Sequence, residues 1–262
     1  MTILRHELRQ GLRTTLLWAV GCAIFVALGM SVYPRVRDAI GLVGRMVESM
    51  GPLAKAFAMD QLEQGEVLGY YAAQAGNILS LGGGLFAAIL GISMLAKEEG
   101  RHTAEYLFPH PISRASVLAQ KFVAVLLHLT LFSAITAGAS WLSLRFLGEA
   151  WSMRDFLEMQ GGIWLLMLCM ACICWGVSAF LSRDSVGLGI GLALLMYFIN
   201  LLINMEVAVP ELRYLTPYYF TDASKLLGPQ GYDPFFLQLG LITAGIFFLV
   251  GTFHYLRKDL RI

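Results

Sequence analysis

The sequence predicts an all-α, polytopic membrane protein. We expect six transmembrane helices, an N-terminal amphipathic interfacial helix, and a short cytoplasmic helix between spans two and three. Two observations carry this prediction. First, 57% of the residues are hydrophobic and only 14% are charged, whereas roughly a quarter of a soluble domain is charged. Second, six apolar runs approach the roughly 20 residues that a helix needs to cross a bilayer.

The first fifteen residues, MTILRHELRQGLRTT, are the predicted interfacial helix. Two stripes run along it at helical spacing, one apolar and one basic: Leu4, Leu8 and Leu12, and Arg5, Arg9 and Arg13. Such a helix lies in the membrane surface, with its apolar side toward acyl chains and its basic side toward lipid phosphates.

The six apolar runs follow one another with only short connections. They are Leu16–Val32, Asn77–Leu95, Val117–Leu144, Gly161–Leu181, Val186–Met205 and Phe235–Leu256. None holds Asp, Glu or Arg in its interior, where each would cost about 2.5–3.5 kcal/mol. Lys121 lies one turn inside the third run, and we expect its ammonium group to reach the interface. No connection is long enough for a soluble core, so residues 1–262 form a single transmembrane domain.

The distribution of basic residues predicts the orientation. With six spans, both termini share a side with the connection after span two. Of the 19 Lys and Arg residues, eleven lie on that side: Arg5, Arg9, Arg13, Lys97, Arg101, Arg114, Lys121, Arg183, Arg257, Lys258 and Arg261. The remainder are spread over a longer stretch of chain. The positive-inside rule therefore places both termini in the cytoplasm.

The connection at residues 96–114, AKEEGRHTAEYLFPHPISR, is charged although it joins two apolar runs. Thr103 is a good helix N-cap, and Glu105 suits the first turn of the helix that would follow. Pro109 and Pro111 would end this helix within two turns. It would then expose a compact apolar group ringed by charge: Tyr106, Leu107 and Phe108. This layout favours docking to a cytoplasmic partner.

This connection resembles the loop after the second span in permease subunits of type-2 ABC exporters. The family pattern is approximately E-E-x-x-G-T-x-E-x-L-L-x-x-P-[IV]-S-R-x(6)-K. The residues in register are Glu99, Thr103, Glu105, Leu107, Pro111, Ile112, Ser113, Arg114 and Lys121. His102 departs from the pattern, because the family usually has glycine there. RYLTPYYF, at Arg213–Phe220, is similar to the family's external YLSPF-x-YF segment.

The resemblance implies the role of this connection. It would be a coupling helix that inserts into a groove on a separate ABC ATP-binding subunit, which carries the ATP and Mg. The residues that would make this contact are Glu98, Glu99, Thr103, Glu105, Tyr106, Leu107, Phe108, Pro111 and Arg114. The chain itself has no G-x-x-x-x-G-K-[ST] phosphate loop, so it would bind no nucleotide cofactor and catalyse no reaction.

The resemblance also implies the assembly and its setting. A second permease copy, identical or related, would complete the pathway in the cytoplasmic membrane of a bacterium or archaeon. Family members commonly export drugs, peptides or lipid-linked molecules, and the lack of charge within the spans favours an amphipathic cargo. Membrane lipid is a further expected partner, and nucleic acid is not.

Three polar residues inside the spans are candidates for the lining of that pathway: His128, Asn200 and Asn204. At this depth, polar groups usually face other helices or water. Hydrogen bonding between neighbouring helices is the alternative interpretation, and we favour it.

Two further patterns point to other chemistry. Cys169 and Cys172 share a helix face near methionines and could bind Cu(I), although cysteine in an apolar helix is commonly a small hydrophobic residue. Ser178 and His254 loosely resemble the dyad of a rhomboid intramembrane serine protease. Ala179 stands where glycine is expected after the serine, which weakens that resemblance. A membrane sensor or anchor without transport activity is a third alternative.

Overall fold

A computed structural model describes residues 2–57, 59, 66–100, 113–181, 185–222 and 233–257. Every regular element in these ranges is helical. The elements are α1 (Thr2–Asp38), α2 (Ile40–Met50), α3 (Pro52–Ala56), α4 (Val67–Tyr71), the π-helical turn η2 (Ala72–Gly76), α5 (Asn77–Gly100), α7 (Arg114–Leu147), α8 (Met153–Ser178), α9 (Val186–Asn204), the 3-10 turn η3 (Pro210–Tyr214), α10 (Pro217–Phe220) and α12 (Pro234–Arg257).

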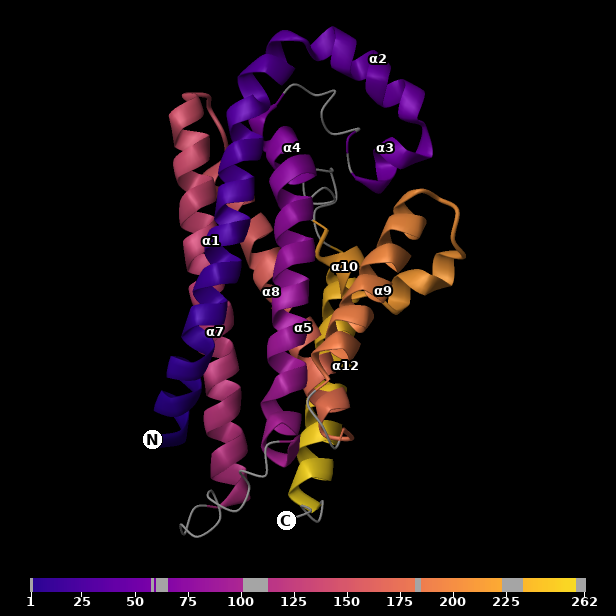
Figure 1. Ribbon diagram of the computed structural model, residues 1–262. Coiled ribbons are helices and arrows are strands. Elements are labelled where there is room, and N and C mark those ends of the chain that lie inside the picture. The colour runs from indigo at the N-terminus through magenta and orange to yellow at the C-terminus, as the bar shows by residue number, and fades with distance from the viewer. Residues whose placement is uncertain are drawn as a thin grey trace.

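The six predicted spans are confirmed. Within the described ranges, six helical stretches are long and apolar enough to cross a membrane. The second of them, Val67–Leu95, runs through α4, η2 and α5. The fourth begins and ends earlier than predicted, because α8 runs from Met153 to Ser178 rather than from Gly161 to Leu181. The N-terminus and the C-terminus lie at the same, lower end of the bundle (Figure 1).

The predicted N-terminal amphipathic helix is not an element of its own. Residues 2–15 are the first turns of α1, which continues without a break to Asp38 and runs beside α7 (Figure 1). Helix α1 has a charged exposed face up to Arg13, and from Leu16 to Val32 every large exposed side chain is apolar. At 1.5 Å per residue, the apolar length is about 25 Å, close to the thickness of a hydrocarbon core. The basic stripe therefore extends beyond the hydrocarbon core.

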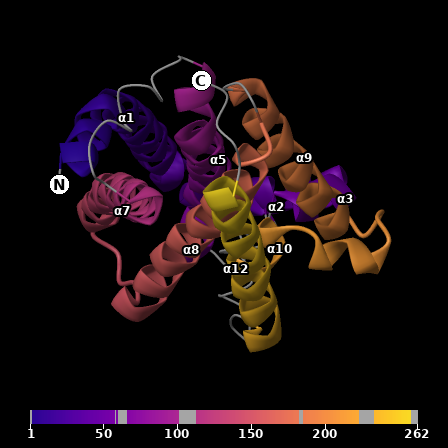
Figure 2. The same ribbon diagram turned by 90° about the horizontal axis from the view of Figure 1, so that it is seen from below.

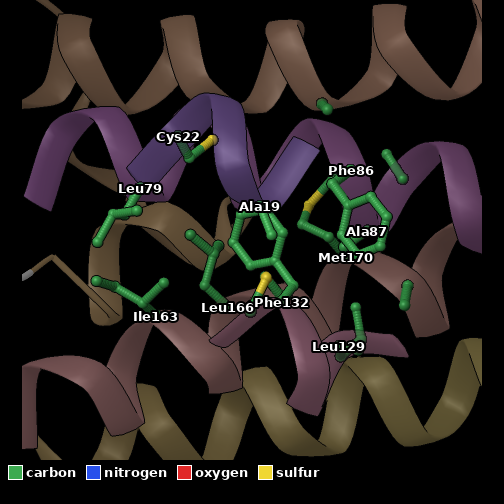
Figure 3. Close-up of a cluster of buried hydrophobic side chains, with 14 of the residues drawn as sticks. Ala19, Cys22, Leu79, Phe86, Ala87, Leu129, Phe132, Ile163, Leu166 and Met170 are labelled. Carbon is green, nitrogen blue, oxygen red and sulfur yellow. The ribbon is translucent and has the colours of Figure 1, made fainter. Parts of the chain in front are cut away.

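Helices α5 and α8 pack together over most of their length, with α9 against α5 and α12 against α8 (Figure 2). α1 and α7 form a second pair that packs on this group. Apolar side chains from several helices meet in the interior (Figure 3). Phe86 of α5 stacks on Phe132 of α7 with ring centroids 5.1 Å apart, and Leu166 and Met170 of α8 belong to the same buried cluster.

Glycine allows α8 and α12 to approach closely. A Cβ on Gly251 would lie 2.7 Å from the Cα of Gly176, and a Cβ on Gly176 would lie 2.6 Å from the carbonyl oxygen of Phe247. Without a side chain at either position, the two backbones come into direct contact. Small residues serve this purpose in membrane helices, since lipid gives no hydrophobic drive for helices to associate.

Candidate functional site

Most of the predicted coupling segment lies outside the described residues, which end at Gly100 and resume at Ser113. Thr103, Glu105, Tyr106, Leu107, Phe108 and Pro111 fall in this gap. Glu98 and Glu99 lie on the last turns of α5, where only the course of the backbone is described.

The chain re-enters the bundle through a capped helix. The Ser113 hydroxyl accepts a hydrogen bond from the Ser116 amide at 3.3 Å, so Ser113 is the N-cap of α7. Arg114, a predicted coupling residue, donates from its guanidinium group to the Leu256 carbonyl at 3.5 Å. The segment 101–112 thus joins the ends of α5 and α7 at the end of the bundle where α12 finishes (Figure 1).

A buried ion pair lies close to this end of α5. Lys121 of α7 is fully buried, and its Nζ donates to the Met94 carbonyl of α5 at 2.6 Å. The Glu7 carboxylate of α1 lies 3.7 Å from the same nitrogen and is 3% exposed. The prediction that Lys121 reaches the interface is therefore wrong, because its charge turns inward to α1 and α5. Sequence reasoning placed Lys121 in the family pattern but missed Glu7, which stands between two residues of the leucine stripe.

His128, a predicted pathway residue, lies at the contact between α1 and α7. Its ring is buried, and Nδ1 lies 2.8 Å from the Thr15 hydroxyl. A Cβ on Gly11 would lie 2.5 Å from Nε2, so the glycine makes room for the imidazole. Within this chain, His128 therefore lies at a contact between two helices.

Asn200 and Asn204 lie on α9, apart from His128 and beside the segment that follows α9. Asn200 is buried, and the amide of Asn204 donates to the Asp222 carboxylate at 3.1 Å. One helical turn before Asn200, the Met196 carbonyl accepts a hydrogen bond from the Thr216 hydroxyl at 2.9 Å. The three predicted pathway residues therefore form two separate sites within one chain.

Tyr218 of α10 anchors the 206–222 segment in the bundle, because its side chain is buried among the helices. It is 2% exposed, and its ring lies 5.5 Å from that of Tyr197 on α9. A Cβ on Gly84 of α5 would lie 2.8 Å from Tyr218 Cζ and nearer still to its hydroxyl. Sequence reasoning singled out RYLTPYYF but not the aromatic residue that enters the core, because the contact depends on a glycine on another helix.

A family model described as ABC-2 family transporter protein matches residues 1–260. The chain belongs to this family. It is therefore a transmembrane subunit of an ABC transporter, and membership implies an ATP-binding partner in the system. No curated protein matches the sequence. The six spans and the charged connection after the second agree with this assignment.

The cysteines of this ABC-2 permease lie in apolar surroundings. Cys169 and Cys172 are buried beside Ala244 and Phe248 of α12. Met167 and Met170 belong instead to the main core cluster. The cysteine pair and the two methionines therefore do not pack in one common cluster. Among the described residues, no group of three or more His, Cys, Asp or Glu residues is arranged to hold a metal ion.

The residues of the protease alternative have different surroundings in this permease. The Ser178 side chain is buried at the end of α8. The His254 ring stacks on Phe180, with centroids 4.2 Å apart, and lines an open pocket on the outer surface. Family membership favours a transport subunit without catalytic activity of its own.

Proposed function

We propose that the chain is the transmembrane subunit of an ATP-driven exporter that couples to a separate ATP-binding subunit through residues 96–114. The observation that carries this proposal is the family match over residues 1–260. The charged connection supports it, since it joins α5 to α7 at the end of the bundle that holds both termini (Figure 1). ATP and Mg would bind on the partner, because the chain has no phosphate-loop motif.

The proposed contact is the apolar group at Tyr106–Phe108, flanked by Glu98, Glu99, Thr103, Glu105, Pro111 and Arg114. When the ATP-binding subunits close, they would push on this segment. The push would reach α5 through its C-terminal turns and α7 through its capped N-terminus. The Glu7–Lys121 pair and the Lys121–Met94 hydrogen bond join α1, α7 and α5 immediately above the segment. These three helices would consequently move together rather than one at a time.

The transport pathway would form between two copies of the single domain, 1–262, in the cytoplasmic membrane of a bacterium or archaeon, with the termini in the cytoplasm. Asn200 and Asn204 would give α9 polar groups for an amphipathic cargo such as a drug, peptide or lipid-like molecule. His128 would stabilise the contact between α1 and α7 within one copy. The 206–222 segment, which contains Tyr218, would close the outer end of the pathway, because its helix α10 packs against α8, α9 and α12.

The coupling contact is tested by replacing Leu107 and Phe108 with Asp in a tagged full-length chain. A matched control places Asp at Val207 and Val209, an apolar pair at the other end of the bundle whose residues are 67% and 62% exposed. We expect the first variant to lose the co-purifying ATP-binding subunit and the control to keep it. Equal retention by both variants would show that the segment is not the contact. Loss in both would also contradict a local contact.

A further inference from the structure

A pocket of about 610 Å³ opens on the outer surface near the end of α12. Its walls are the side chains of Phe180, Leu249, Val250, Phe253, His254 and Arg257. Four of these are apolar and at least half exposed, and the other two are basic. The volume is in the range of small-ligand pockets, about 300–1,000 Å³.

The position of the pocket along α12 places it at a membrane boundary. Apart from Gln238, near the start of the helix, the large exposed side chains of α12 between Phe235 and Phe253 are all apolar. At 1.5 Å per residue, these residues span about 27 Å, close to the thickness of the hydrocarbon core. His254 and Arg257 follow in the last turn, so the apolar wall faces acyl chains and the basic rim faces headgroups. This boundary is on the side of the two termini (Figure 1).

The two basic side chains at the pocket both pack against aromatic rings. The Arg257 guanidinium group lies over the Phe253 ring, 3.9 Å from its centroid, and the His254 imidazole stacks on Phe180. Among the described residues that line the pocket, none carries a carboxylate. Basic residues in the last turn of a helix favour its dipole, but the dipole does not account for an apolar pocket beneath them.

We propose that this pocket binds an anionic phospholipid of the adjacent leaflet. One acyl chain lies along Leu249, Val250 and Phe253, and the phosphate group contacts Arg257 and a ring N–H of His254. A zwitterionic lipid with the same chains fits the apolar wall but adds no net charge for the basic rim to attract. The site is separate from the coupling segment, and its test requires neither an ATP-binding subunit nor transport.

The test is native mass spectrometry of the full-length chain in mild detergent with added lipid. Phosphatidylglycerol and phosphatidylcholine with identical acyl chains are compared. We expect wild type to retain more phosphatidylglycerol. Arg257→Gln lowers that retention about fivefold, which is the typical contribution of one basic residue near an anionic headgroup. Arg154→Gln is the matched control, since Arg154 is an exposed arginine in the first turn of α8, at the other end of the bundle.

Val250→Trp tests the acyl-chain part by filling the pocket, and it should lower the retention of both lipids. Circular dichroism and gel filtration confirm that each variant is folded. Equal retention of the two lipids by wild type would overturn the proposal, as would equal loss in Arg257→Gln and Arg154→Gln. Displacement of phosphatidylglycerol by inorganic phosphate, with no effect of Val250→Trp, would show an anion site without a lipid chain and would also overturn it.

Discussion

At the scale of single residues, several buried polar side chains of the spans lie where one helix meets another. Thr15 and His128 meet between α1 and α7, and Tyr71 of α4 donates to the Ser140 hydroxyl of α7 at 3.1 Å. Polar groups inside a membrane are costly unless another group satisfies them. A hydrogen bond between helices meets that requirement and also fixes which faces pack together.

Tyr218 is a different case, because space rather than a hydrogen bond defines its position. Its buried hydroxyl has no hydrogen-bond partner among the described residues, and it lies where Gly84 leaves room. We predict that Gly84→Ala lowers the free energy of unfolding by about 1–3 kcal/mol, the usual cost of overpacking a core. The measurement is a denaturation curve in mixed detergent micelles.

Two further variants separate this contact from a general effect on helices. Gly138→Ala is the control, since nothing lies within 4 Å of a Cβ at that position, and alanine is the better helix former by up to about 1 kcal/mol. Tyr218→Phe removes the hydroxyl and should recover part of the stability lost in Gly84→Ala. If Gly84→Ala is as harmless as Gly138→Ala, the hydroxyl does not fill that space.

At the scale of elements, the contact between α1 and α7 combines apolar packing with the buried Glu7–Lys121 pair. Two buried charges stabilise each other only at close range. A buried charge left without its counter-ion lowers the free energy of unfolding by about 3–5 kcal/mol. The pair therefore makes the position of α1 depend on that of α7. Through the Met94 carbonyl, this dependence extends to the C-terminal turns of α5.

We predict that Lys121→Met destabilises the chain by about 3–5 kcal/mol and that adding Glu7→Leu recovers most of the loss. The matched control is Arg154→Met. It breaks the Arg154–Glu158 pair, whose side chains are 85% and 41% exposed, and should cost about 0.5 kcal/mol or less. Unfolding curves of the four proteins give these differences. A cost for Lys121→Met no larger than that of the control would contradict the buried pair.

The elements also show how far the sequence predicts this fold. Apolar runs predicted all six spans, because span length follows from the thickness of the bilayer. The continuity of α1 was missed, since an alternating Leu and Arg pattern is equally typical of a helix lying in the membrane surface. The inward direction of Lys121 was also missed. The direction of this side chain depends on Glu7 and on the Met94 carbonyl. Helix packing brings these groups close to Lys121, and that packing leaves no periodic pattern in the sequence.

At the scale of the whole molecule, the even number of spans places both termini and the coupling segment at one end of the bundle. The re-entrant α10 segment, together with α2 and α3, lies toward the other end (Figure 1). This polarity suits a transporter subunit, since ATP is available on only one side of the membrane. The proposed coupling site and the proposed outer closure are thus at opposite ends of the same helices.

Cysteine labelling tests this polarity directly. The four native cysteines are all buried, so an impermeant maleimide should not label the wild-type chain. Ser49 of α2 and Ser116 of α7 are exposed at opposite ends. We predict that Ser49→Cys is labelled on intact cells and Ser116→Cys only after permeabilisation. The reverse result would invert the proposed orientation.

The most direct test of the central claim is affinity purification of the tagged wild-type chain from its native membranes in mild detergent, with quantitative mass spectrometry of the eluate. An ATP-driven exporter subunit should bring down an ABC ATP-binding subunit in approximately one-to-one ratio, as expected for two copies of each. Recovery of the folded chain with no such subunit would contradict the claim that ATP hydrolysis drives this protein.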